Sequence, residues 1–178
     1  VTGIVEPEAE RLVRTLPDFG PIDLSRPEAW DLRLTNEERA KAKAALAPLT
    51  PGRRLLCASI GARAVEKDWG DANWLALFNR LATVAREHAL AMIGAGAEHE
   101  RSERLRAAWQ GESVNLCGSL TPRESAAVTD HAVLHMGHDS GPMHLAASRG
   151  VPCVVVFGSY NKPRKWYPYG AHHHVLHD

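Results

Sequence analysis

Short apolar runs alternate with longer amphipathic segments from residue 53 onward, and this alternation sets the expected fold. The apolar runs suit buried strands and cover 55–58, 89–94, 114–117, 132–136 and 153–157. Between them, apolar residues at helical spacing predict helices over 74–84 and 98–109, and further helices starting near 121 and 142. Strands that alternate with helices form parallel sheets covered on both faces. The pattern therefore predicts an α/β fold, with a Rossmann-like parallel sheet and helices on both faces.

The first 52 residues lack this alternation. A short helix is expected over 6–16, followed by a polar, proline-containing connector. Thr35-Asn36-Glu37-Glu38 has the form of a capping box and predicts a second helix, running to Leu46. We therefore expect a linker with two helices over 1–52 and an α/β domain over 53–178.

Composition narrows the class of protein. Hydrophobic residues make up 44% of the 178 residues and charged residues 24%, which is typical of a globular chain. The 21 basic residues equal the 21 acidic ones in number, so nothing indicates a nucleic-acid partner. No apolar run approaches the roughly 20 residues of a transmembrane helix, and no signal peptide opens the chain. Cys57, Cys117 and Cys153 lie in or beside apolar runs without paired spacing, which favours reduced core thiols and a cytoplasmic location.

The ten histidines do not form a recognisable metal motif. They are scattered, and His172-His173-His174 has no carboxylate or cysteine beside it, so a polar strand edge or loop is the favoured interpretation. We therefore predict no metal site and no cofactor.

The most informative stretch is His135–Ala147. An apolar run leads into Asp139-Ser140-Gly141, and a helix follows with Pro142 in its first turn, where proline is tolerated. The free N–H groups and the positive end of the helix dipole would then face the carboxyl edge of the sheet. That arrangement suits a phosphate or diphosphate, although an ordinary strand-to-helix turn with a capping serine has the same pattern.

Three segments after this stretch make the whole pattern typical of a single protein family. Residues 139–147, 150–152, 157–160 and 166–170 together resemble the carboxyl-terminal half of the heptosyltransferase-like glycosyltransferases of family 9. That family has Asp-Ser/Thr-Gly-Pro-Met-His-Leu-Ala-Ala, then Gly-Val/Thr-Pro, Phe-Gly-Pro-Thr and Trp-x-Pro-Tyr-Gly, and this sequence departs from it at Ser159-Tyr160. The resemblance implies the donor-binding half of a GT-B enzyme that transfers a sugar from a nucleoside diphosphate, with inversion and without a required metal.

The resemblance also implies a set of binding residues after the strands: Ser59, Lys67, Glu100, Leu120, Asp139, Ser140, Gly141 and His144. Lys67, in Lys67-Asp68-Trp69, would contact the donor phosphates. Glu100, with Glu98 as second choice, would hold the ribose. Leu120 would border the base, and Asp139 would bind a sugar hydroxyl. The alternatives are a solvated lysine, acidic residues stabilising a helix start and ordinary core packing.

The resemblance further implies the partners. A nucleotide-diphosphate sugar is expected as donor, with ADP-heptose favoured, and lipopolysaccharide core as acceptor. The acceptor and the general base would belong to an amino-terminal domain for which 1–52 holds no second sheet, so we expect this chain alone not to turn over. Peripheral association with the inner membrane is left open. A non-catalytic nucleotide- or phosphosugar-binding module and a sugar-nucleotide epimerase of GT-B type are the alternatives.

Overall fold

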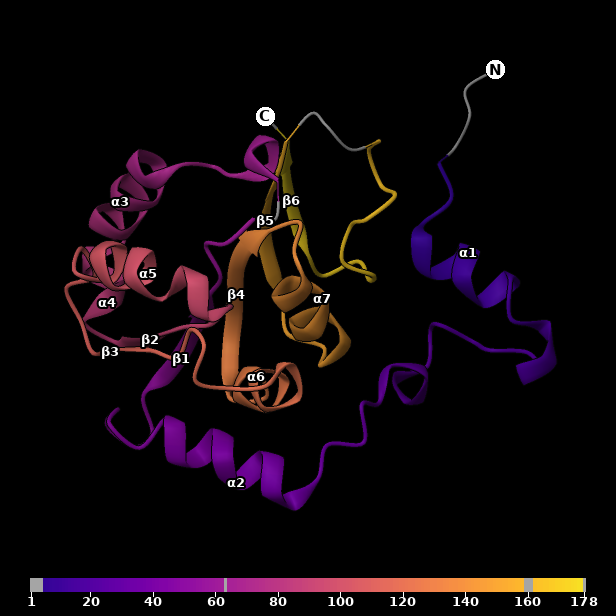
Figure 1. Ribbon diagram of the computed structural model, residues 1–178, viewed down its shortest axis with the longest axis horizontal. Coiled ribbons are helices and arrows are strands. Elements are labelled where there is room, and N and C mark those ends of the chain that lie inside the picture. Colours follow the sequence, from indigo (N-terminus) through magenta and orange to yellow (C-terminus); the bar gives the residue numbers. More distant parts are fainter. Residues whose placement is uncertain (1–4, 63, 159–161, 178) are drawn as a thin grey trace.

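The computed structural model describes residues 5–62, 64–158 and 162–177 (Figure 1). A leader contains α1 (Glu8–Arg14), the 3-10 turns η1 (Pro17–Phe19) and η2 (Pro27–Trp30), and α2 (Asn36–Ala45). The α/β part contains β1 (Arg54–Ala58), η3 (Val65–Lys67), α3 (Asp71–Arg80), α4 (Ala82–Ala85), β2 (His88–Met92), η4 (Gly96–Glu98), α5 (His99–Arg106), β3 (Ser113–Asn115), α6 (Pro122–Thr129), β4 (Ala132–His138), α7 (Gly141–Ser148), β5 (Cys153–Phe157) and β6 (His174–His177).

These strands form one sheet in the order β3-β2-β1-β4-β5-β6, and every neighbouring pair is parallel. The predicted α/β class is therefore confirmed. Along the chain, β1, β2 and β3 follow one another toward one edge of the sheet. The chain then crosses back, and β4 pairs with the other side of β1. A sheet whose strand order reverses in this way opens a crevice at the carboxyl ends of the two central strands, and ligands of such folds bind there.

Residue alternation along the strands explains how the two faces are covered. Leu56, Leu90 and Met92 point to one face and pack with Trp74 and Phe78 of α3. The intervening residues, among them Leu55, Cys57, Ala89 and Ala91, point to the other face and pack with Ala126, Ala127 and Val128 of α6. Successive strand side chains alternate between faces, so each strand contributes to both cores. All three cysteines are buried free thiols: Cys117 and Cys57 lie in these two cores, and Cys153 lies in a third cluster with Met143 of α7.

The second helix of the leader packs as part of the α/β body. Leu34 and Ala42 are buried in the cluster on the α6 face, and Leu46 packs against it. The predicted capping box is present, because the Thr35 hydroxyl accepts from the Glu38 N–H while the Glu38 carboxylate accepts from the Thr35 N–H. The Arg123 guanidinium from α6 pairs with Glu38, which fixes α2 against α6.

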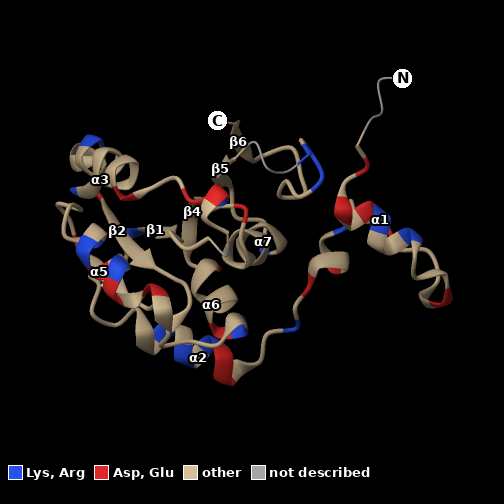
Figure 2. Cartoon of the chain, turned by 45° about the horizontal axis from the view of Figure 1, so that its top comes forward, with Lys and Arg blue, Asp and Glu red and all other residues tan. Residues whose placement is uncertain are grey.

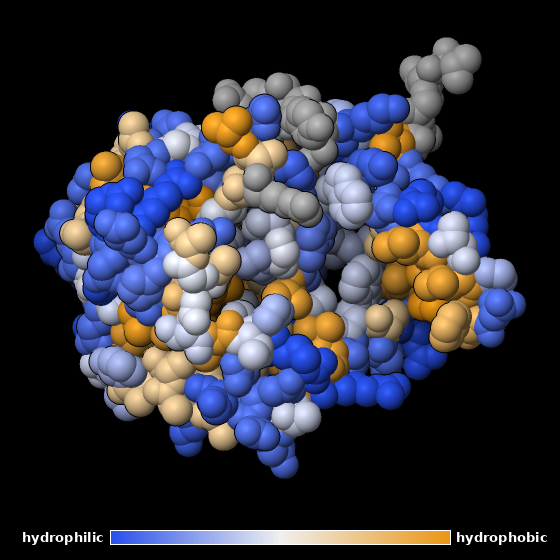
Figure 3. All heavy atoms as spheres, in the orientation of Figure 1, coloured by the Kyte–Doolittle hydropathy of each residue, from blue (hydrophilic) through white to orange (hydrophobic). Residues whose placement is uncertain are grey.

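The first helix of the leader is less deeply attached. Its Glu8 N–H donates to the Lys165 carbonyl, 2.8 Å away. Exposed apolar side chains gather along α1 and just after it, where Figure 3 shows hydrophobic surface at the right; they are Leu12, Leu16, Phe19 and Ile22. Acidic residues lie in the first turn and basic residues in the last turn of α1, α2 and α5, an order that the helix dipole favours (Figure 2).

Two elements differ from the sequence prediction. The helix expected over 74–84 is broken, because Leu81 has a ψ of 12° and separates α3 from α4. A sixth strand, β6, was not predicted, since its four residues lack an apolar run. His174 opens that strand, and the predicted polar strand edge is therefore confirmed for this histidine. On the sheet face opposite α7, Val154, Val156 and Leu176 of β5 and β6 line an apolar groove of about 470 Å³ that α3 and α4 cover only in part.

Candidate functional site at the carboxyl edge of the sheet

A pocket of about 340 Å³ lies at the carboxyl ends of β1 and β2. Glycines make room for it, since Gly61, Gly94, Gly96 and Gly118 are all among its lining residues. The rest of the lining is Ser59, Ala95, Glu98, Leu120, Pro122, Ser125, Pro142 and Leu145. Of the residues that the sequence predicted for a ligand, Ser59 and Leu120 therefore line this pocket directly, and α7 contributes to it through Pro142 and Leu145.

Beside the pocket, Lys67 and Asp139 form an ion pair. The Lys67 Nζ lies 2.6 Å from the Asp139 Oδ2, and their side chains are 23% and 7% exposed. Lys67 ends η3 in the segment after β1, whereas Asp139 directly follows β4. The two residues are 72 positions apart in sequence and meet because β1 and β4 are neighbours in the sheet. A cationic amine is thereby fixed at the crevice.

His144 flanks the same carboxylate from α7. Its Nε2 lies 3.9 Å from the Asp139 Oδ1. Loss of hydration lowers the pKa of His144; the nearby Lys67 amine acts in the same direction, while the Asp139 carboxylate opposes both. The imidazole is therefore favoured as the neutral form, which can donate one hydrogen bond and accept another.

Ser140 precedes α7 without capping it. It has an extended backbone, and its side chain makes no capping bond to the helix. Its Oγ is buried and has no hydrogen-bond partner among the described residues. By contrast, the Thr121 hydroxyl caps α6 by accepting from the Glu124 N–H. The first N–H groups of α7, beginning at Gly141, thus lack a side-chain cap, and this arrangement suits an anion.

Ser59 is tied to a buried histidine that the sequence analysis did not single out. The Ser59 Oγ lies 3.2 Å from the His135 Nε2, and the two residues are 1% and 0% exposed. Burial lowers the pKa of His135 to about 4, so the ring is neutral at pH 7. A Cβ on Gly137 would lie 2.6 Å from the Ser59 Oγ, so only glycine fits between them. The available signal was a histidine inside an otherwise apolar strand.

The two acidic residues considered for the ribose occupy different positions. Glu98 lines the pocket, and its Oε2 accepts from the Ala95 N–H at 2.9 Å. A Cβ on Gly61 or Gly94 would lie 1.7 or 2.0 Å from this carboxylate, so both glycines are needed for it to lie there. Glu100 is exposed in the first turn of α5 and does not line the pocket. Glu98 is therefore held by the turn that it stabilises, whereas Glu100 faces solvent.

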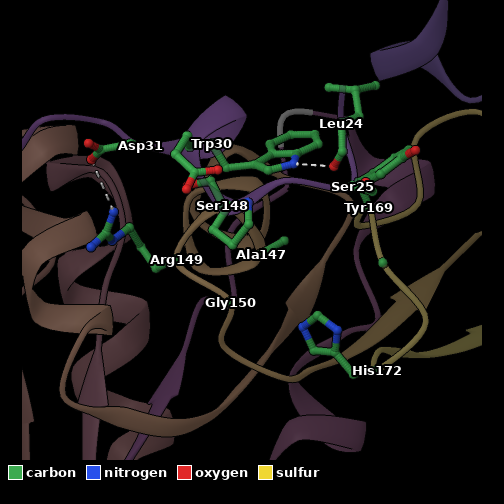
Figure 4. A pocket seen from close by; sticks show the side chains of 13 residues that line it. Leu24, Ser25, Trp30, Asp31, Ala147, Ser148, Arg149, Gly150, Tyr169 and His172 are labelled. Atoms are coloured by element: carbon green, nitrogen blue, oxygen red, sulfur yellow. Dashed lines mark hydrogen bonds and ion pairs between the residues drawn. The ribbon is translucent and has the colours of Figure 1, made fainter. Parts of the chain in front are cut away.

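A larger cavity lies elsewhere (Figure 4). It has a volume of about 720 Å³ and opens between the leader and the carboxyl-terminal end of α7, at the opposite edge of the sheet. Trp30 stacks on Tyr169 with ring centroids 5.1 Å apart, and Arg149 lies 3.9 Å from Asp31 across its wall. None of the predicted ligand residues lines it. Cavity size alone therefore does not mark the candidate site.

Within the described ranges, no group of three or more His, Cys, Asp and Glu side chains is arranged to hold a metal ion. His173 of the histidine tract has a structural role, since its Nδ1 accepts from the Cys153 N–H and its Nε2 lies 3.1 Å from the Tyr169 carbonyl. Among the helices that the structure describes, none has the length and apolar character needed to cross a membrane. Ser159-Tyr160, where the sequence departs from the family pattern, lies outside the described residues.

Comparison with known proteins finds relatives with the same fold. A solved glycosyltransferase of family 9 from Veillonella parvula matches with a TM-score of 0.72 and 24% identity, over 82% of this chain and 41% of the other. The E. coli heptosyltransferase WaaC, solved with ADP-2-deoxy-2-fluoro heptose, matches with a TM-score of 0.59 and 25% identity, over 76% and 40%.

A curated relative, the lipopolysaccharide core heptosyltransferase OpsX of Haemophilus influenzae, is 25% identical over 108 residues, which are 58% of this chain and 30% of that protein. The chain thus spans less than half the length of these relatives. The model of one family, described as glycosyltransferase family 9 (heptosyltransferase), matches residues 6–177. On that match, which takes in nearly the whole chain, the protein belongs to glycosyltransferase family 9.

Proposed function

We propose that this chain binds the nucleotide-diphosphate sugar donor of a glycosyltransferase that adds heptose to lipopolysaccharide core, with ADP-heptose as the favoured donor. The observation that carries the proposal is the Lys67–Asp139 ion pair, held beside the uncapped start of α7 at the crevice between β1 and β4. Family membership supports the reaction class, and the E. coli relative solved with a fluorinated ADP-heptose supports the donor.

The proposed chemistry is electrostatic. When the bond between the sugar and the diphosphate breaks, negative charge grows on the departing phosphate oxygens. The Lys67 amine would exchange its bond to Asp139 for one to the phosphate, and the first N–H groups of α7 would bind further oxygens. The Asp139 carboxylate would then accept a hydrogen bond from a sugar hydroxyl. This charge neutralisation needs no metal ion, and the general base is expected in another domain.

The nucleoside would lie along the glycine-lined pocket. Leu120 is half-buried at its wall and supplies an apolar surface for a purine. Glu100, exposed at the start of α5, is the proposed partner of the ribose hydroxyls, because the Glu98 carboxylate is already engaged with the Ala95 N–H. Ser59 lies just after β1, where its hydroxyl contacts His135, and we expect it to face the diphosphate.

The test compares ADP with adenosine in titration calorimetry. Lys67→Ala should weaken ADP binding by about ten- to a hundredfold, the effect of one charge-assisted contact, while adenosine binding changes little. Glu100→Gln should weaken both ligands by a similar factor, since both carry the ribose. Lys43→Ala, which removes an exposed lysine on α2, is the matched control and should leave both affinities unchanged.

The loss in Lys67→Ala should also shrink at high salt, because the Lys67 side chain is 23% exposed and salt partly screens its contact with phosphate. If Lys67→Ala weakened ADP and adenosine by the same factor, as Glu100→Gln is expected to do, the proposed site would be contradicted, since Lys67 would then have no specific relation to phosphate.

A further inference from the structure

The segment that carries Lys67 has little regular structure of its own. Among its described residues between the end of β1 and the start of α3, the one regular element is η3, a 3-10 turn of three residues. Such short turns have few internal hydrogen bonds, so tertiary contacts must set the position of the lysine. The proposed role of Lys67 depends on those contacts.

One guanidinium spans both ends of this segment. Arg101, on α5, donates from Nη1 to the Ile60 carbonyl at 3.3 Å, near the end of β1. At the other end it binds both oxygens of Asp68, from Nη1 at 2.5 Å and from Nη2 at 2.9 Å. Its Nε donates to the Asp71 Oδ1 at 2.6 Å, in the first turn of α3. Only 23% of the Arg101 side chain is exposed, so these bonds are partly shielded from water.

The electrostatics of Asp68 agree with a strong contact. Burial raises the pKa of the Asp68 carboxyl, but the hydrogen bonds from Arg101 and from the Gly70 N–H outweigh that effect and hold the pKa below its usual value. Asp68 is the residue directly after Lys67. Fixing its carboxylate therefore fixes the backbone from which the Lys67 side chain extends.

A second set of contacts, to β4 and α3, holds the same segment. The Trp69 N–H donates to the His138 Nε2 at 3.1 Å, and the Trp69 ring packs edge-on against Trp74 with centroids 5.3 Å apart. A Cβ on Gly158 would lie 2.5 Å from the Glu66 carbonyl, so the segment also runs close against the end of β5. Arg101 supplies the charged contacts in this arrangement, and it makes them with a planar fork that lysine cannot reproduce.

We propose that Arg101 is a positioning residue for the donor site. By binding Ile60, Asp68 and Asp71 at once, it holds the segment after β1 in the conformation that directs the Lys67 amine toward Asp139 and the donor diphosphate. The proposal rests on the proposed function for the part played by Lys67, while the ordering of the segment by Arg101 is independent of any ligand.

The ligand-free test is amide hydrogen exchange followed by mass spectrometry. Arg101→Lys keeps the charge but loses the fork, and should speed exchange across 64–69 by about tenfold. Arg104→Gln is the matched control, because Arg104 lies on the same helix with its side chain 61% exposed and only a 3.9 Å approach to Asp71. Asp68→Asn, which weakens the contact from the other side, should reproduce the Arg101→Lys result. Unchanged exchange in Arg101→Lys would overturn the proposal, whatever the nucleotide measurements show.

The binding test separates positioning from a general loss of structure. Arg101→Lys should weaken ADP by about tenfold, which corresponds to roughly 1.4 kcal/mol, and leave adenosine within about twofold. In the Lys67→Ala background the same change should alter ADP affinity by less than about twofold, because its effect acts through the lysine.

Equal weakening of ADP and adenosine, or full additivity with Lys67→Ala, would overturn the positioning role. If the unmodified chain binds neither ligand, the proposed function fails. The exchange experiment then still supports or overturns the ordering of the segment by Arg101.

Discussion

Lowering the pH from 7 to 4 is expected to destabilise this chain through one buried side chain in particular, His135. The ring is fully buried in β4, and its neutral form is the one that the fold accommodates. Burial lowers the pKa of His135 from 6.5 to about 4. In the unfolded chain the imidazole binds its proton as the pH falls through about 6.5, whereas the folded chain resists protonation until about pH 4.

The sign and the size of the effect follow from linkage. Stability contributed by neutral His135 is fully present above about pH 6.5 and is lost progressively down to about pH 4. A tenfold difference in proton affinity corresponds to about 1.4 kcal/mol, so the whole loss is on the order of 3 kcal/mol. That is a large fraction of the roughly 5–15 kcal/mol by which domains are usually stable.

Urea unfolding at several pH values between 7 and 4 measures this loss. His135→Gln cannot titrate, so its free energy of unfolding should fall less steeply with acid than that of the unmodified chain. The difference between the two proteins isolates His135, because His138 and His144, whose pKa values are also lowered by burial, are present in both. His131→Gln, a change at an exposed histidine, is the control. Parallel pH profiles for the unmodified chain and His135→Gln would refute the reasoning.

Two further predictions follow from the glycines and from the absence of a metal cluster in the described part of the chain. Gly118→Ala should lower the free energy of unfolding by about 1–3 kcal/mol in urea titrations, because Gly118 has a φ of +76° and its Cβ would lie 2.5 Å from the Gly96 Cα. Gly96→Ala is its control, since that Cβ has ordinary contact at 3.7 Å; equal losses would contradict the argument. ADP affinity by calorimetry should be unchanged by EDTA, because no described group of His, Cys, Asp and Glu could hold an ion, and a large loss would count against a metal-independent site.

The sequence allowed the fold to be predicted where local signals agree with tertiary packing. Short apolar runs marked β1, β2, β4 and β5, and the capping box at Thr35 marked the start of α2. Parallel pairing then brings the ends of neighbouring strands together, so Lys67 and Asp139 could be expected at the same edge. The short, polar strand β6 and the break at Leu81 gave no such signal, since both depend on packing rather than on periodicity.

The contacts that organise the site were harder to foresee. Arg101 binds Asp68 and the Ile60 carbonyl across 33 and 41 positions in sequence, and an arginine and an aspartate at these positions would also suit an ordinary surface. Likewise, nothing in the sequence shows that the Ser59 hydroxyl meets the His135 ring across 76 positions. Long-range polar pairs follow from the strand order and register, which periodicity alone does not define.

Ser140 shows where a local rule fails and what that failure indicates. Serine before a helix predicts a side-chain cap, and caps of this type contribute about 1 kcal/mol. At α2 and α6 the expected caps form, whereas at α7 the Ser140 Oγ is buried without a partner in the described structure and the helix start has no side-chain cap. An unsatisfied buried hydroxyl destabilises the free protein, so it persists only where something offsets that cost. A donor diphosphate that binds the α7 N–H groups and the Ser140 hydroxyl would supply the missing bonds, consistent with local rules failing most often at functional positions.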